Sequence, residues 1–356
     1  MKKVKLGVLL LATSCLLQLS NGNILAQQAN KDLLERMAEQ RRNLEEFKAK
    51  QKQMLETLKE KNYKFRIGLT EANKYRLEQI TGLIKPKNLD EDKKKHEAKE
   101  KEMLKDEERK KEEFKREHRD QKLPEEENPC NPNAKAFNWR DAKKVTPIKM
   151  QFSCGSCWAF TAAAAYETSY WIRNGKSIDI SEQDVLACSQ AGSCAGGWYE
   201  GVFRFWKERP AVLEEQDPYQ NKETPCRRHA PTNYYTVAWG YVRNSENPRK
   251  NIPTVKDIKE ALCKYGILAS TVKVTDFFMS YKGGIYDEHP PVNGESDVNH
   301  GINIVGWDDT KKAWLIKNSW STNWGEQGYM WIEYGSNNIG FGTMWVLAQS
   351  EILKGK

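Results

Sequence analysis

The first 138 residues of this 356-residue chain contain no tryptophan, and glycine is scarce there. All 12 tryptophans fall between residues 139 and 345, and only four glycines precede residue 129. Large aromatic side chains and tight turns build compact cores. The folded part therefore belongs to the C-terminal two thirds. The length allows one domain of about 200–250 residues and an N-terminal appendage.

A strong excess of one charge is also missing. The net charge is +8, but residues 27–128 hold 28 basic and 25 acidic side chains, and residues 129–356 hold 26 and 24. Neither region is basic enough to form a nucleic-acid footprint. We therefore expect no nucleic-acid partner.

Long apolar runs are absent after the first residues. Three lysines precede an apolar run over residues 6–19, and a cut is expected after Ala26. Because the run is shorter than the ~20 residues that span a bilayer, residues 1–26 are predicted to be a signal peptide. We expect an exported protein, secreted or periplasmic, with no membrane span. A cell-surface lipoprotein acylated at Cys15 is the less favoured alternative, because the apolar run continues past this cysteine.

The segment between the leader and the core is polar and highly charged. Residues 27–90 carry apolar side chains at helical spacing. Over residues 91–122, 25 of 32 residues are charged, with opposite charges four apart. Such a stretch can form a solvated helix but cannot bury a core, so we expect a spacer or disordered linker. A Pro-rich boundary at residues 124–129 then opens the domain 129–356.

Helix signals precede strand signals in the C-terminal domain. Helices are expected from Cys157 to about Asn174, after the capping box at Ser181, and from Thr254 to Gly266. Strands are expected at Ile267–Val274, Gly301–Trp307, Ala313–Lys317, Tyr329–Tyr334 and Met344–Ala348. This order argues for an α+β protein with two lobes.

Three residues far apart in sequence have the chemistry of a thiol active site. Cys157 stands where a helix should begin, and a helix N-terminus favours thiolate over thiol. Among five histidines, His300 is the best candidate base, because it opens an apolar strand that can hold its ring rigidly. Asn318 ends another apolar strand, and its amide oxygen can fix the tautomer and plane of the imidazole.

These motifs resemble the papain-like cysteine peptidases. The resemblance covers roughly residues 137–347 and is carried by the segment Cys154–Trp158, with His300 and Asn318 at 143 and 161 residues after the nucleophile. It implies a papain-like two-lobe fold, a helical lobe and a strand-rich barrel-like lobe, with the active-site cleft between them. It also implies an endopeptidase that acts on proteins or peptides through a thioester and needs no cofactor. Residues 27–128 would be the pro-segment of a zymogen and its inhibitor.

The resemblance assigns further roles beside the nucleophile. Gln151 would donate its side-chain amide to an oxyanion hole, together with the backbone N–H of Cys157. Trp320 would cover the hydrogen bond between imidazole and amide. Trp324 would border the side of the cleft that holds the leaving group.

The resemblance also implies a substrate-binding face. Gly196 and Gly197 would let a substrate strand approach and pair with the backbone. Trp198, Tyr199 and Met344 would line the pocket for the residue that precedes the scissile residue. These three side chains are apolar or aromatic, so we expect a hydrophobic residue in that pocket.

Three residues depart from the pattern of the family. Phe152 and Ser321 stand where the family usually has glycine, and Asn299 precedes the histidine where aspartate is common. These changes are expected to reshape the rim of the cleft and to shift the pH profile. None of them removes a catalytic group.

The cysteine count fits an exported protein with one reactive thiol. Eight cysteines, less Cys15 in the leader and Cys157, leave six, which is enough for three bridges. The resemblance pairs Cys154 with Cys194 and Cys188 with Cys226. The two others, Cys130 and Cys263, do not match the usual third bridge of the family, and we hypothesise that they pair with each other.

Other functions remain as alternatives. The spacing of Cys154 and Cys157 is also that of dithiol redox motifs, but those have different flanking residues. Zinc would require a second cysteine or histidine pair that Cys188 and Cys194 do not supply, so we expect no metal. A non-catalytic binding protein on a peptidase scaffold is disfavoured because every reactive group is present. An exopeptidase or peptide transferase of the same fold is disfavoured because no insertion carries a histidine pair to cap the cleft.

Overall fold

The chain forms two compact units, Met1–Lys50 and Gln51–Lys356. The computed structural model describes the backbone of residues 3–353 and, from residue 27 on, the side chains of all but residue 29. The predicted signal peptide and Cys15 therefore lie outside the described side chains. The first unit is the greater part of helix α1 (Lys3–Glu60). In the part of the chain that the structure describes, no helix has the length and apolar character of a membrane span.

The second unit is an α+β domain, as predicted. Its helices after the end of α1 are α2 (Leu77–Ile80), α3 (Leu89–Glu117), α4 (Cys157–Asn174), α5 (Glu182–Cys188), α6 (Tyr199–Glu208), α7 (Val255–Tyr265) and α8 (Asp276–Met279). Its strands are β1 (Phe65–Ile67), β2 (Ala136–Asn138), β3 (Gly192–Ser193), β4 (Gly196–Gly197), β5 (Thr236–Tyr241), β6 (Leu268–Val272), β7 (Tyr281–Tyr286), β8 (His300–Asp308), β9 (Ala313–Lys317), β10 (Tyr329–Glu333) and β11 (Met344–Ala348).

Local capping signals set the helix ends predicted from the sequence. The Ser181 side chain accepts a hydrogen bond from the N–H of Asp184, which opens α5. Thr254 and Asp257 form the capping box that opens α7. Helix α4 ends at Gly175, whose φ of +72° is the left-handed conformation that glycine adopts without strain.

Nine strands form one open sheet. Eight of them follow the order β1-β7-β10-β9-β8-β6-β11-β5, and β2 pairs with β8. The sheet has two ends, β1 and β5, so the strand-rich lobe is not a closed barrel. Strands β8 and β9 are antiparallel neighbours, which brings the start of one beside the end of the other. This register places His300 and Asn318 at the same edge.

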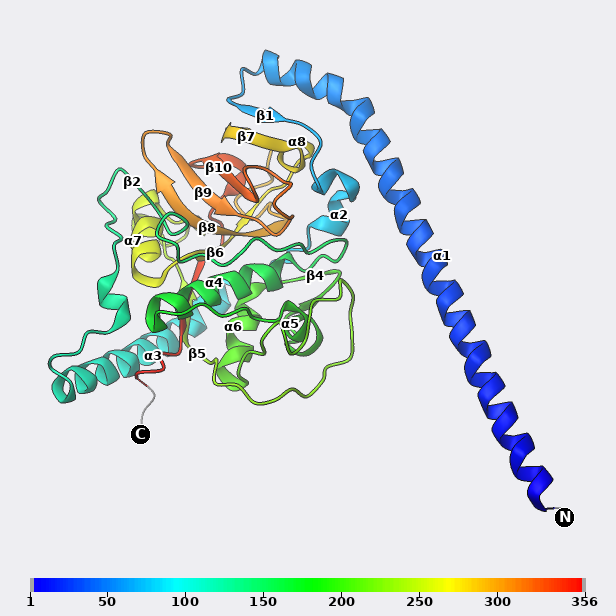
Figure 1. Cartoon of the computed structure of the whole chain (residues 1–356). Coiled ribbons are helices and arrows are strands. Elements are labelled where there is room, and N and C mark those ends of the chain that lie inside the picture. The colour runs from blue at the N-terminus through cyan, green and yellow to red at the C-terminus, as the bar shows by residue number, and fades with distance from the viewer. Residues whose placement is uncertain (1–2, 354–356) are drawn as a thin grey trace. The chain divides into compact units, whose positions relative to one another are not determined.

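Helix α4 lies between the sheet and the smaller helices (Figure 1). It contacts β8 and β11 on one side and α5 and α6 on the other. Nearly all of its side chains are buried, and the run Ala162–Ala165 is small enough to let neighbours approach from both sides. The helix therefore carries its first residue, Cys157, into the boundary between the two lobes.

All three predicted disulfides are confirmed. The bridges are Cys154–Cys194, Cys188–Cys226 and Cys130–Cys263. Cys157 is the free cysteine among the residues whose side chains are described. One thiol is thus left for chemistry.

The expectation that the charged stretch 91–122 is a spacer or disordered linker is wrong. Most of it forms α3, which packs against β5. Glu100 and Glu107 are buried and pair with Arg243 and Arg173 of the following domain. The composition revealed the charges of the helix but not their partners. Arg243 lies 143 residues after Glu100, and Arg173 lies 66 residues after Glu107.

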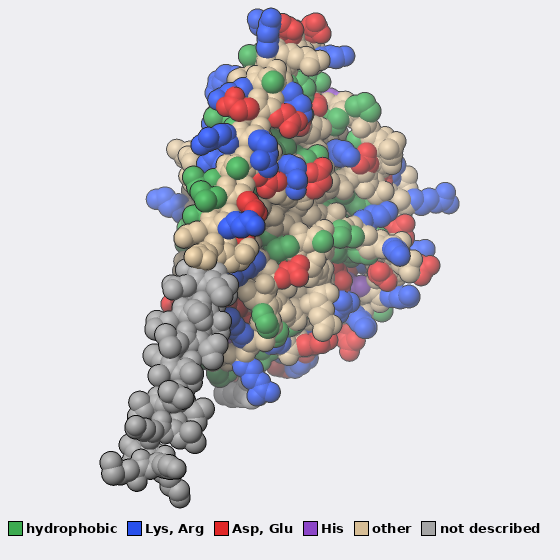
Figure 2. Space-filling view, turned by 90° about the vertical axis from the view of Figure 1, so that its right-hand side faces the viewer, with side chains coloured by type: hydrophobic (Ala, Val, Ile, Leu, Met, Phe, Trp, Pro, Cys, Tyr) green, Lys and Arg blue, Asp and Glu red, His purple; other side chains and the backbone are tan. Residues whose placement is uncertain are grey.

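The two charge signs are mixed on the surface. On the face drawn in Figure 2, Lys and Arg side chains lie among Asp and Glu side chains. This agrees with the near balance of 57 basic and 49 acidic residues.

Candidate active site

Cys157 is the first residue of α4 and is fully buried. Its Sγ accepts a hydrogen bond from the backbone N–H of Gly301 at 3.3 Å. Gly301 directly follows His300 in β8, so this contact joins the helix that carries the thiol to the strand that carries the imidazole. The structure therefore brings the predicted nucleophile and the predicted base into one site.

The imidazole of His300 is held by Asn318, as the sequence predicted. His300 Nε2 and Asn318 Oδ1 lie 2.8 Å apart. The ring of Trp320 packs at 4.6 Å from the His300 ring and is itself fully buried, so it shields this bond from water. With Nε2 engaged, His300 Nδ1 is buried and has no hydrogen-bond partner among the described residues.

Burial keeps the Cys157 thiol and the His300 imidazole neutral in this structure. Because both side chains are fully buried, we call it the covered state. Burial raises the pKa of Cys157 to about 12, although backbone N–H groups, including that of Gly301, lower it. It also lowers the pKa of His300 to about 4, against the opposing effect of the hydrogen bond that the ring donates to Asn318. A charged form is costly where water is excluded. The site therefore holds a thiol and a neutral imidazole rather than an ion pair.

Gln151 is buried next to the turn that precedes the nucleophile. Its Nε2 donates to the backbone oxygen of Cys154 at 3.0 Å, and its Oε1 accepts from Ser319 Oγ at 2.7 Å. These two bonds fix the plane of the amide. An amide nitrogen carries two hydrogens, so one remains to donate to an oxyanion.

Residues 82–84, here called the cleft-filling segment, lie against the residues predicted to bind substrate. The N–H groups of Gly82 and Leu83 both donate to the oxygen of Asn299 at 3.1 Å. The N–H of Gly197 donates to the oxygen of Gly82, and the N–H of Ile84 donates to the oxygen of Gly197, each at 2.9 Å. The backbone predicted to pair with substrate at Gly197 is therefore already paired with residues 82–84.

The contact between this segment and the cleft is close enough to require glycine. A Cβ added to Gly82 would lie 2.0 Å from the backbone oxygen of Gly155. A Cβ on Gly155 would in turn lie 2.6 Å from the oxygen of Thr81. Both obstacles are backbone atoms, which cannot move aside as a side chain can. This contact was not predicted, and the isolated Gly82 within an apolar stretch is its one signal in the sequence.

The predicted specificity pocket is apolar and buried. Trp198 stacks on Tyr199 with ring centroids 4.6 Å apart, and Tyr199 donates its hydroxyl to the oxygen of Gly342. Met344 and Leu83 are buried in the same hydrophobic cluster. The cluster therefore combines the pocket residues with an apolar side chain of the cleft-filling segment.

The two tryptophans predicted to border the cleft are both fully buried. Trp320 Nε1 donates to the oxygen of Ile80 at 3.1 Å, so it contacts the N-terminal segment directly. Trp324 packs edge-on against Trp320, with 5.4 Å between centroids, and donates to the oxygen of Phe278.

The residues that replace the expected glycines have left-handed backbones. Phe152 has a φ of 54° and Ser321 a φ of 62°. For residues with a Cβ this conformation costs roughly 1–2 kcal/mol. Phe152 is also 43% exposed next to Gln151, so a large apolar side chain stands on the rim. The third departure, Asn299, has no such strain. Its Oδ1 accepts a hydrogen bond from the backbone N–H of Val274 at 2.7 Å.

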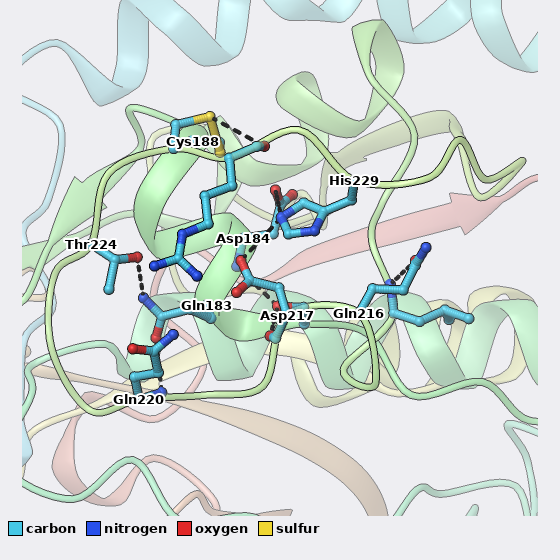
Figure 3. A network of polar contacts seen from close by, with 12 residues as sticks. Gln183, Asp184, Cys188, Gln216, Asp217, Gln220, Thr224 and His229 are labelled. Atoms are coloured by element: carbon cyan, nitrogen blue, oxygen red, sulfur yellow. Dashed lines mark hydrogen bonds and ion pairs between the residues drawn. A yellow bond between two sulfur atoms is a disulfide. The ribbon is translucent and has the colours of Figure 1, made fainter.

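A second polar cluster lies at helix α5 and the loop that packs on it (Figure 3). Asp184, Asp217 and His229 bring potential ligand atoms within 4.8 Å of one another. His229 Nε2 is 3.3 Å from the Asp217 carboxylate, and Arg209 Nη2 is 2.9 Å from that of Asp184. Because Arg209 already supplies positive charge to the carboxylates, the cluster is an ion-pair network that holds its loop to α5. It does not test the expectation that the chain binds no metal.

Comparison with known proteins identifies the family. The family described as papain family cysteine protease matches residues 133–349. The chain therefore belongs to the papain family of cysteine proteases. Pro-cathepsin H of Mus musculus is 32% identical over 216 residues, which is 59% of this chain and 63% of that protein. Peptidase 1 of Dermatophagoides farinae is 33% identical over 203 residues, 56% of this chain and 60% of that protein. The match thus spans less than two thirds of the length of these relatives.

Solved structures agree on the fold. The recombinant stem bromelain precursor superimposes with a TM-score of 0.61 at 22% identity, over 86% of this chain and 91% of that one. The Carica candamarcensis cysteine protease CMS1MS2, in complex with E-64, gives a TM-score of 0.52 at 28% identity, over 60% of this chain and 98% of that one. The precursor matches more of this chain than the protease does.

Proposed function

We infer that this chain is the zymogen of an exported cysteine endopeptidase that hydrolyses peptide bonds in proteins. The observation that carries this inference is the meeting of a thiol, an imidazole and an amide. The free thiol of Cys157 is hydrogen-bonded to Gly301, the residue after His300, and the imidazole of His300 is hydrogen-bonded to the amide of Asn318. A thiol, an imidazole and an orienting amide are the parts that covalent acyl transfer needs.

In the proposed reaction, His300 first takes the proton of the Cys157 thiol, and the resulting thiolate attacks the substrate carbonyl carbon. The oxyanion accepts hydrogen bonds from the Gln151 amide and the Cys157 N–H. The C–N bond then breaks, a thioester remains on the sulfur, and His300 gives its proton to the leaving amine. Water attacks the thioester while His300 takes a proton from it, and the acid product leaves with the thiolate restored.

Loss of the Gln151 amide is expected to slow hydrolysis without unfolding the protein. Gln151→Ala should lower kcat/KM of the processed enzyme by roughly 10–1,000-fold, because one oxyanion donor is lost. Gln151→Glu keeps the side-chain length but removes the donor, so it should show a similar loss. Fluorogenic peptide assays, with thermal melting to check folding, provide the measurement. Unchanged kcat/KM in both variants would remove Gln151 from the oxyanion hole.

We also propose that residues 27–128 act as the pro-segment and 129–356 as the peptidase domain. Support comes from the backbone pairing of Gly82 and Ile84 with Gly197, which uses the groups a substrate would need. A substrate cannot enter while this segment is in place. Self-inhibition follows from occupancy of the cleft rather than from a distorted site.

Separately produced residues 27–128 are expected to inhibit the processed enzyme at micromolar concentration or below. Gly82→Ala in this fragment should weaken inhibition at least about 10-fold, because its Cβ meets the backbone of Gly155. Gly68→Ala is the matched control, since its Cβ would lie 3.2 Å from the flexible Lys282 side chain. Inhibition constants provide the measurement. No inhibition by the unsubstituted fragment, or equal effects of both substitutions, would count against the proposal.

Substrate class and location complete the proposal. The apolar cluster of Trp198, Tyr199 and Met344 supports a hydrophobic residue before the scissile residue. End-blocked and free-ended peptides separate endopeptidase from exopeptidase activity.

Three disulfides support export to an oxidising compartment, which agrees with a signal peptide at residues 1–26 and a secreted or periplasmic location.

A further inference from the structure

The linker between the cleft-filling segment and α3 is open to proteases. Lys85, Lys87 and Asn88 are exposed, and residues 85–88 form no helix or strand. The last backbone bond of the cleft-filling segment is that of Ile84 with Gly197. Exposed segments without regular structure are the preferred sites of proteolytic nicking. A cut here would free the cleft-filling segment while leaving α3 joined to the domain.

Helix α3 is bound to the domain along its whole length. At its start, Asn251 bonds both Asp90 and Lys93, at 3.0 and 2.6 Å. One turn later the His96 ring stacks on Trp239, 4.8 Å away, and its Nε2 lies 2.8 Å from the Trp239 oxygen. These contacts fasten the helix to β5 and its neighbouring loop.

The middle of α3 protects an edge of the sheet. Strand β5 is the last strand of the sheet and therefore has one side without a strand partner. Glu100 lies against Gly240 of β5 and pairs with both guanidinium nitrogens of Arg243, at 3.0 and 2.7 Å. Uncovered edge strands invite pairing with other chains. Loss of α3 would expose this edge.

The end of α3 neutralises a charge in the interior of the domain. Arg173 lies in the last turn of α4, the helix that begins with Cys157, and is 2% exposed. Its acidic partners are Glu107 of α3 and Glu125, both before residue 129. A buried charge that loses its partner destabilises a protein strongly. The peptidase domain without α3 would carry an unpaired arginine in its central helix.

We propose that activation cuts the chain within residues 85–88 and that α3 stays as a permanent part of the active enzyme. The released inhibitor is then the segment up to this linker, shorter than residues 27–128. The retained helix supplies the carboxylate that pairs with the charge of Arg173, and it covers β5. The chain that follows it is tied to the domain by the Cys130–Cys263 bridge. This inference rests on the proposed peptidase function, because it describes how that enzyme is released.

Substitutions in α3 test the proposal in the active enzyme itself. If α3 is retained, Glu107→Gln should lower the Tm of the processed enzyme by roughly 5 °C or more, because the Arg173 charge is left without its main partner. Glu108→Gln, one residue further on and exposed, should leave the Tm unchanged. Intact mass should show a chain that begins within residues 86–88. Identical Tm values for both processed variants, with a mass that lacks α3, would overturn the proposal.

A second experiment does not depend on the activity of the chain. The full-length Cys157→Ala protein is treated briefly with subtilisin, and the fragments are separated by size exclusion and weighed. The first cut after residue 50 should fall within residues 85–88, and α3 should elute with the domain even if the exposed residues 119–122 are also cut. Elution of α3 away from the domain would refute its retention. If α3 is retained but the wild-type protein has no peptidase activity, the proposed function fails and the architecture stands.

Discussion

Replacing Cys157 with alanine is expected to lower kcat/KM for peptide hydrolysis by about 10⁴-fold or more. The sulfur forms the covalent bond to the substrate, and no other free thiol is present among the residues whose side chains are described. The remaining oxyanion donors can bind a substrate, but they cannot replace the nucleophile. The folded state should persist, because the Cys157 sulfur accepts hydrogen bonds from backbone N–H groups, including that of Gly301, and holds no side chain in place.

The measurement compares processed wild-type and Cys157→Ala proteins on an end-blocked peptide with a hydrophobic residue before the scissile residue. Processing of the variant by an added protease ensures that its cleft is free. Thermal melting and intact mass verify that both proteins are folded and equally cut. Cleavage by the variant at a rate near that of the wild type would refute the thioester mechanism.

The second large effect concerns the thiol before activation. In the covered state burial raises the pKa of Cys157 to about 12, so at pH 7 the thiol is almost entirely protonated. Residues 82–84 also bar access to the sulfur. Iodoacetamide should therefore alkylate the zymogen at least about 1,000-fold more slowly than the processed enzyme at this pH. Equal rates in the two forms would contradict the covered, neutral site.

The same experiment, repeated across pH, tests the imidazole. Burial lowers the pKa of His300 to about 4 from its ordinary 6.5. The neutral imidazole therefore stabilises the covered state fully above pH 6.5, and this contribution is lost as the pH falls through 4. The difference corresponds to about 3 kcal/mol. Opening of the zymogen, followed as the fraction labelled after return to pH 7, should increase as the preincubation pH falls from 6.5 to 4.

Local patterns predicted the parts of the fold that position the chemistry. Capping signals depend on a few neighbouring residues only. Helices α5 and α7 begin directly after Ser181 and Thr254, and α4 stops at Gly175, as predicted. Apolar runs predicted β8 and β9, whose register brings His300 to Asn318. Their contact with Cys157 could be expected only from the resemblance to the papain family, because 143 residues separate thiol and imidazole in the chain.

Long-range partners explain what the sequence did not reveal. The stretch that forms most of α3 was expected to be a spacer or disordered linker because its charges are visible in the sequence, whereas the positions of Arg173 and Arg243 opposite them are not. The cleft-filling residues 82–84 bond through their backbone, which leaves almost no trace in the side-chain pattern. Strand β5 was not predicted, although turn-forming residues flank it at positions 231–233 and 244–248.

The most direct test of the central claim is labelling of the processed enzyme with an epoxide inhibitor that reacts with activated thiols, read by intact mass and peptide mapping. We predict one adduct per molecule, on Cys157, complete loss of peptidase activity, and strongly reduced labelling of a His300→Ala variant. An adduct on another residue, or full peptidase activity in protein labelled at Cys157, would contradict the account.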